Sequence, residues 1–142
     1  MKIMAVDYGD TRTGLAVCDP SELLASPVDQ LEEKSMAKVV AKVAEASKQH
    51  NVGMIVVGLP LNMDGTEGAR AKKSRKMAGQ LEAAVEVPVK MWDERRTTVS
   101  AAAMLSDCGT FGKKRKAVLD AVSAAVILES YLAWRKNHPG EE

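Results

Sequence analysis

Short apolar stretches separated by polar, turn-forming residues predict five strands along the chain. Residues 2–6 are typical of a buried strand, and residues 13–18 alternate, with Leu15 and Val17 on one face and smaller residues on the other. The turn around Gly9 is short enough to make these two segments a hairpin, so we expect them to be antiparallel. Further strands are expected near residues 25–31, at 54–57, where Gly58 would end the strand, and at 87–92.

Helical periodicity follows or separates the later strands. Residues 35–49 place an apolar stripe that includes Val39 and Val43 on one side and lysines on the other. Because strands and helices alternate in the second half of the chain, we expect parallel pairing there and a mixed α/β sheet with helices on both faces. The other helices are expected over about 67–84, with Thr66 as a possible cap, over 99–106 after a threonine cap, and over 115–136.

The composition favours one ordinary globular domain. A chain of 142 residues can bury a sizeable core, so we expect a single domain over residues 1–138 and a loose tail at 139–142. The two cysteines are far apart and have no metal-binding spacing, which is typical of a reducing compartment. No apolar run reaches the roughly 18 residues of a membrane span or forms a signal-peptide core. We therefore expect a cytoplasmic protein with no membrane partner.

The net charge of +1 hides an uneven distribution. Basic residues cluster at 70–76 and at 113–116, whereas acidic pairs lie elsewhere, as at 93–94. A near-neutral total can place a basic face beside an acidic pocket, although each basic run alone could equally be a solvated surface.

Three carboxylates stand at positions that call for a partner. Asp7 directly follows one predicted strand and the pair Asp93 and Glu94 follows another, and ligands bind beyond such strand ends in open α/β sheets. Asp120 interrupts the otherwise apolar stretch 117–128, where an unpaired carboxylate is costly. A divalent cation, Mg²⁺ or Mn²⁺, would satisfy Asp7, Glu94 and Asp120 together.

Such a site could hydrolyse a phosphodiester, since two metal ions roughly 4 Å apart clamp the attacking and leaving oxygens. The sequence contains no GxSxG, GxxxxGK[ST] or HExxH motif that would favour another chemistry. Each acid also has a structural explanation: Asp7 as a turn residue, Asp93 and Glu94 as helix-start charges, and Asp120 as the partner of Lys116. Their joint occurrence favours the metal site.

Several short motifs occur together in one order. The chain resembles the YqgF family, also described as RuvX-like proteins, pre-16S ribosomal RNA nucleases and Holliday junction resolvases. The matching segments span nearly the whole chain, and the loop around residues 57–66 is the most specific of them. They are Asp7-Tyr8-Gly9 with Arg12-Thr13-Gly14-Leu15-Ala16; Val57-Gly58-Leu59-Pro60-Leu61-Asn62-Met63-Asp64-Gly65-Thr66; Asp93-Glu94-Arg95 with Thr97-Thr98; and Leu119-Asp120 with Ala124-Ala125 and Ile127-Leu128-Glu129-Ser130-Tyr131.

The resemblance implies a ribonuclease H-like fold and catalytic, metal-binding acids at Asp7, Glu94 and Asp120. Whether Asp93 is a ligand or a supporting neighbour stays open, although the family pattern favours Glu94. Arg96 stands where we would expect an apolar residue, which adds charge near the site.

Substrate contacts are expected from arginines near these acids and from the turn-forming loop. The basic helix over about 67–84 and the second basic run are expected to follow the nucleic-acid backbone. The loop could instead be a tight turn that caps the next helix. Five aromatic residues leave little material for base stacking. The residues expected to bind substrate are Arg12, Asn62, Asp64, Gly65, Thr66, Arg95, Arg96, Lys113, Lys114 and Arg115.

The resulting hypothesis is a metal-dependent endo- or exonuclease that acts on structured RNA or branched DNA. The resemblance points to trimming of pre-16S rRNA ends in ribosome biogenesis, within ribosomal precursor particles. Holliday junction cleavage is the alternative in the same class. A binding module that does not cut and a phosphotransferase of the actin and sugar-kinase type are alternatives from other classes. The number of metal ions and the state of the protein, monomer or homodimer, stay open.

Overall fold

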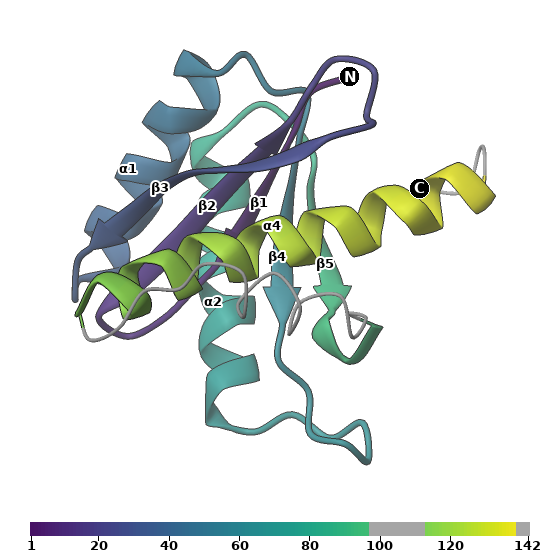
Figure 1. Cartoon of the computed structure of the whole chain (residues 1–142). Coiled ribbons are helices and arrows are strands. Elements are labelled where there is room, and N and C mark those ends of the chain that lie inside the picture. The colour runs from purple at the N-terminus through teal and green to yellow at the C-terminus, as the bar shows by residue number, and fades with distance from the viewer. Residues whose placement is uncertain (97–112, 139–142) are drawn as a thin grey trace.

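A five-stranded mixed sheet forms the centre of the computed structural model (Figure 1). The structure describes residues 1–96 and 113–138, and the side chains of residues 1–95 and 122–138. The strand order in the sheet is β3-β2-β1-β4-β5. The strands are β1 (Ile3–Asp7), β2 (Arg12–Cys18), β3 (Ala25–Glu32), β4 (Met54–Leu59) and β5 (Val89–Asp93).

The pairing within this sheet confirms the predicted mixture of directions. β1 and β2 form the expected antiparallel hairpin, with Asp7 opposite Gly14, and β2 pairs with β3 in the same sense. β4 joins β1 in parallel, and β5 joins β4 in parallel. The carboxyl ends of β1, β4 and β5 therefore meet at one edge of the sheet.

Two helices cover one face of the sheet. In α1 (Met36–Gln49) the predicted stripe, with Val39 and Val43, is buried, and α2 (Ala69–Ala84) buries Met77 and Leu81. These side chains share a core with Met4, Val6 and Leu15 of the sheet. Leu15 and Val17 face this side, as the alternation of residues 13–18 predicts.

A long helix, α4 (Lys113–Asn137), crosses the opposite face (Figure 1). Its buried residues Ala124, Ile127, Leu128 and Tyr131 pack on the smaller side chains of the sheet, which include Ala5, Ala16 and Cys18. Helices on both faces are thus confirmed. Short residues on this face let α4 lie close to β1 and β2.

Several predicted boundaries were wrong. β4 continues through Gly58 to Leu59, because both residues pair with β5 at Trp92 and Asp93. α2 begins after an N-cap at Gly68, so Thr66 does not cap it. β5 runs over 89–93 rather than 87–92.

The last helix begins at Lys113, so Lys113 and Lys114 lie on it rather than before it. The expected helix at 99–106 and the expected loose tail at 139–142 lie outside the described residues. In the described part of the chain, none of the helices has the length and apolar character that a membrane crossing requires.

Candidate functional site

The sheet edge where the parallel strands end carries two of the three predicted acids. β1 ends at Asp7, β5 ends at Asp93, and Glu94 opens a short 3-10 turn, η1 (Glu94–Arg96). β4 runs between them, with Val57 beside Val6 and Gly58 beside Trp92. Adjacent strands are about 4.8 Å apart, so the ends of β1 and β5 are separated by only one strand.

Asp7 belongs to the face of the sheet that α4 covers. Side chains alternate along a strand, and the two preceding residues of the same parity, Ile3 and Ala5, both pack in the core under α4. Asp7 is half-buried at the end of this row. Its carboxylate therefore lies at the rim of the core beneath α4 rather than beneath α1 and α2.

Glu94 reaches the same face because Gly58 has no side chain. A Cβ atom at Gly58 would lie 2.7 Å from Cδ1 of Ile127 and 3.1 Å from Cδ of Glu94. The Glu94 side chain thus lies over the backbone of β4, beside a buried residue of α4. Gly58 was expected only to end a strand, so sequence reasoning missed its part in making room for this carboxylate.

The surroundings of Glu94 disfavour its charge. Burial raises the pKa of the Glu94 carboxyl group, and the nearby Asp93 carboxylate raises it further. The Arg70 guanidinium acts in the opposite direction. A carboxylate in this setting is suited to a cation as a partner.

Position 120 is on α4, seven residues before Ile127. Seven residues are close to two turns of an α-helix, so the two positions share a face of α4. Among side chains in 1–95 and 122–138, no group of three potential metal-binding residues occurs. The side chains of Asp120, Arg96, Lys113, Lys114 and Arg115 lie outside that part of the chain.

Arg95, expected to bind substrate, is engaged within the protein. Its Nε lies 3.1 Å from both carboxylate oxygens of Asp93, and its Nη2 lies 2.7 Å from Oδ2. Nη1 donates to the carbonyl oxygen of Met63 at 3.4 Å. Asp93, left open as a metal ligand, is thus the partner of Arg95 and raises the pKa of its guanidinium.

The loop between β4 and α2 is held by its own hydrogen bonds. The backbone N–H groups of Asn62, Gly65 and Thr66 donate to Thr66 O, Asn62 O and Asp64 Oδ1. The Thr66 hydroxyl donates to Asp64 at 2.6 Å and accepts from the Asn62 amide. The hydrogen bonds that the Thr66 hydroxyl and backbone N–H donate to Asp64 lower the pKa of its carboxyl group. Gly65 has φ +88°, a conformation that favours glycine. These three N–H groups are therefore not directed at a ligand.

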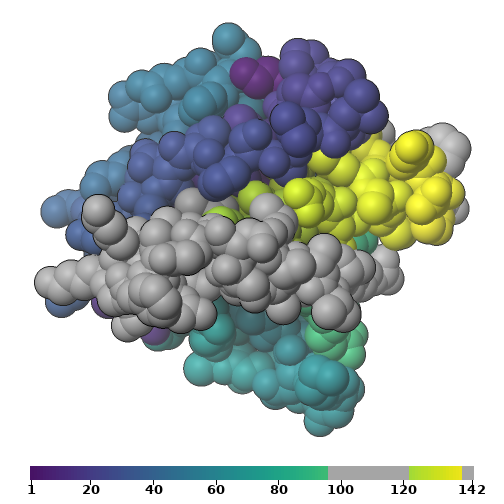
Figure 2. Space-filling model, viewed as in Figure 1, coloured from purple at the N-terminus to yellow at the C-terminus, as the bar shows by residue number. Residues whose placement is uncertain are grey.

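This loop extends beyond the carboxyl ends of β4 and β5 (Figure 1), and Figure 2 shows the same part of the molecule projecting from the surface. Met63 near its tip is 91% exposed. The loop is thus a compact projection beside the acidic edge.

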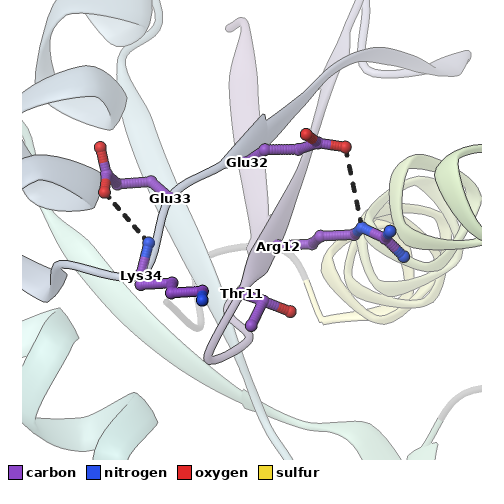
Figure 3. A pocket seen from close by; sticks show the side chains of 5 residues that line it. All are labelled: Thr11, Arg12, Glu32, Glu33 and Lys34. Carbon is purple, nitrogen blue, oxygen red and sulfur yellow. Dashed lines mark hydrogen bonds and ion pairs between the residues drawn. The ribbon is translucent and has the colours of Figure 1, made fainter.

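Arg12 starts β2 and lines an open hollow with Thr11, Glu32, Glu33 and Lys34 (Figure 3). Its Nε lies 3.9 Å from Glu32. Two cations that were not named as single site residues, Arg70 and Lys73 of α2, line a hollow with the β1–β2 turn, which follows Asp7. Their signal in the sequence was the basic run at 70–76, which was expected on a helix that follows the nucleic-acid backbone but was not expected to adjoin the acids.

Solved structures share this architecture. The Thermus thermophilus RuvC in complex with Holliday junction substrate matches with a TM-score of 0.64 and 16% identity, covering 94% of this chain and 96% of that one. The fowlpox virus Holliday junction resolvase matches with a TM-score of 0.54 and 13% identity, over 94% and 99%. At these identities the likeness shows the fold, and the ribonuclease H-like architecture is confirmed.

Similarity in sequence is closer. A relative from Syntrophus aciditrophicus, described as a "Putative pre-16S rRNA nuclease", is 41% identical over 132 residues, 93% of this chain and 88% of that protein. One from Halothermothrix orenii with the same description is 37% identical over 140 residues, 99% and 100% of the two chains. The family model described as "RuvX: Holliday junction resolvase" matches residues 1–134. The resemblance read from the motifs is therefore confirmed, and this chain belongs to the RuvX family.

Proposed function

We propose that this chain is a metal-dependent nuclease that hydrolyses nucleic-acid phosphodiester bonds at the carboxyl ends of β1, β4 and β5. The observation that carries the proposal is the convergence of Asp7 and Glu94 on one face of the sheet, with Gly58 leaving room between them. The names of the family and of its relatives support a nuclease. A module that binds without cutting would have no need for a costly half-buried acid such as Glu94.

The residues at this edge fit a divalent cation. Asp7 and Glu94 provide hard oxygen donors, which Mg²⁺ and Mn²⁺ prefer, and the space over Gly58 lets Glu94 approach. Asp120, on the same face of α4 as Ile127, would complete the set of acids. Bound there, the cation would activate a water molecule and offset the charge that develops on the phosphate.

The protein's own groups would position the substrate. The hydrogen bonds that Arg95 donates to the Asp93 carboxylate fix the start of η1. They thereby fix the position from which the Glu94 side chain extends. The apolar residues under α4 exclude water from one side of the acids. Contacts to the nucleic-acid backbone would make affinity fall with salt. The residues proposed for such contacts are Arg12, Arg96, Lys113, Lys114 and Arg115.

For the substrate, we propose the ends of pre-16S rRNA. The support is the description shared by relatives that match nearly their whole length. Cleavage of a four-way DNA junction is the second candidate, favoured by the family description and by the likeness to a RuvC bound to such a junction.

One assay tests the proposal. Purified protein is incubated with RNA spanning a precursor–mature 16S end, with a four-way DNA junction or with ATP, in Mg²⁺, Mn²⁺ or EDTA. We expect metal-dependent cleavage that Asp7→Asn abolishes. Asp29→Asn on exposed β3 makes the same chemical change away from the site and should cleave normally. Equal cleavage by Asp7→Asn would place the site elsewhere, binding without cutting would favour a module, and ATP turnover a phosphotransferase.

A further inference from the structure

A small hollow lies between the β1–β2 turn and the first turns of α2. It is lined by Tyr8, Gly9 and Asp10 from the turn and by Arg70 and Lys73 from the helix. Tyr8 directly follows Asp7, so the hollow adjoins the carboxylate edge on the side of the sheet opposite to α4. A Cβ at Gly9 would lie 2.4 Å from the carbonyl oxygen of Arg12, which shows how tightly the turn is closed.

The two cations in this hollow differ in their partners. Lys73 Nζ lies 2.9 Å from Oδ1 of Asp10, so its charge is already paired. Arg70 is exposed and makes no ion pair with any residue that the structure describes. It is nevertheless close enough to Glu94 to stabilise the charged carboxylate. The Arg70 guanidinium is thus a cation beside the acidic edge that can still bind an anion.

An arginine at this place is suited to bind a phosphate group of the substrate. The acids at the edge would repel an approaching nucleic-acid backbone, and a cation next to them offsets that repulsion. The guanidinium group can donate two parallel hydrogen bonds to phosphate oxygens, which an ammonium group cannot do in a fixed plane. Arg70 is exposed in the first turn of α2, where a phosphate can reach it.

We propose that Arg70 binds a backbone phosphate of the substrate next to the bond that is cut. The inference rests on the proposed nuclease function and adds a substrate-binding residue to that site. If Arg70 served only to compensate Glu94, its loss would change the ionisation of the carboxyl group but would not remove a phosphate contact. The salt dependence of binding separates these two roles.

The test measures binding of the precursor 16S RNA to the full chain in EDTA over a range of salt concentrations. Arg70→Gln should bind about tenfold more weakly, since a hydrogen bond to a charged group contributes on that order. The slope of log affinity against log salt should become shallower by about 0.7 to 0.9, the value of one phosphate contact. The control Lys72→Gln removes the same charge two residues along α2, about 200° around the helix, and should change neither quantity as much.

Rescue and cleavage complete the test. Arg70→Lys should restore the salt slope but only part of the affinity. Lysine keeps the positive charge but cannot donate the two parallel hydrogen bonds of a guanidinium group. In Mg²⁺, Arg70→Gln should raise KM more than it lowers kcat. If Arg70→Gln binds and cuts like Lys72→Gln while the wild type cuts normally, the inference fails and the nuclease proposal stands. If the wild type never cuts but the slope still depends on Arg70, the nuclease proposal fails and the phosphate contact stands.

Discussion

At the scale of single residues, the site depends on a carboxyl group that the fold does not favour. Burial and the neighbouring Asp93 both raise the pKa of Glu94, so its charged form is more stable in the unfolded chain than in the folded one. Groups that cost stability and sit in a site are candidates for function. The charged Glu94 carboxylate thus lowers the stability of the fold and is also the group that we propose to act in the site.

We expect Glu94→Gln to abolish cleavage without lowering the stability of the metal-free protein. Between the ordinary pKa of 4.5 and the raised pKa in the fold, the folded state holds more protons than the unfolded state. The free energy of unfolding therefore falls as pH rises through that window. Glu94→Gln should remove this slope and keep or raise Tm at neutral pH in EDTA, as thermal unfolding at several pH values would show.

A Tm that drops sharply for Glu94→Gln at neutral pH would mean that the charged form is stabilised in the fold. The control is Glu45→Gln on the exposed face of α1, which should leave both Tm and its pH dependence unchanged.

The space above Gly58 gives a second prediction. An added methyl group in Gly58→Ala would collide with Ile127 and Glu94, so we expect a loss of about 1–3 kcal/mol in stability from overpacking. Cleavage should fall further than the loss of folded protein explains, because Glu94 is displaced. The measurements are chemical denaturation and cleavage rate per folded molecule.

Gly79→Ala is the matched change, because nothing lies within 4 Å of a Cβ on this exposed residue of α2. It should gain about 0.5–1 kcal/mol from helix propensity and keep full activity. Full activity in Gly58→Ala would remove Glu94 from the proposed site.

At the scale of elements, periodicity predicted most of the fold. The alternation of Leu15 and Val17 assigned the two faces of β2 correctly, and the stripe of residues 35–49 became the buried side of α1. Boundaries that depend on a partner strand were missed, as at Gly58, where pairing with β5 overrides the tendency of glycine to end a strand.

The sequence signals the acids at the sheet edge more directly than the cations that lie beside them. Asp7 and Glu94 follow apolar runs, and that local signal is visible in the sequence. Arg70 lies in a run of similar charges, and only the packing of α2 against the β1–β2 turn distinguishes it from Lys72. The engagement of Arg95 by Asp93 and Met63 likewise depends on side-chain geometry that spacing does not determine.

This engagement gives a prediction for the projecting loop. Arg95 joins the end of β5 to the loop through Met63, and its guanidinium lies 3.4 Å from the position of a Cβ on Gly65. Arg95→Lys keeps the charge but loses the fork, so the loop should open more often. Hydrogen exchange at the amides of Asn62 and Gly65 should become severalfold faster.

Arg75→Lys provides the comparison, because Arg75 also forms an ion pair, at 2.6 Å, but with Glu67, which lies outside the loop residues 62–66. Unchanged exchange in Arg95→Lys would mean that the internal bonds of Asn62, Asp64 and Thr66 hold the loop without help.

At the scale of the whole molecule, the packed cores lie apart from the sheet edge that carries the acids. The sheet and its helices bury two continuous cores, one on each face. The acids collect where three parallel strands end, and neither Asp7 nor Glu94 belongs to the two cores. The free energy of unfolding should therefore come mainly from the two cores. A ligand that binds at the edge should increase it.

The last prediction follows from this division. A cation that binds the folded chain and not the unfolded one stabilises it by RT ln(1 + [L]/Kd), which is about 2.7 kcal/mol when the ion is at about 100 times its Kd. We expect Mg²⁺ or Mn²⁺ to raise Tm of the wild-type protein in thermal unfolding, relative to EDTA, while Asp7→Asn shows little change. Asp29→Asn, on exposed β3, should respond like the wild type. A rise of equal size in all three proteins would indicate a general effect of the ion rather than binding at the edge. Because unfolding is measured without substrate, the result bears on the metal site even if the natural nucleic acid differs from the one that we propose.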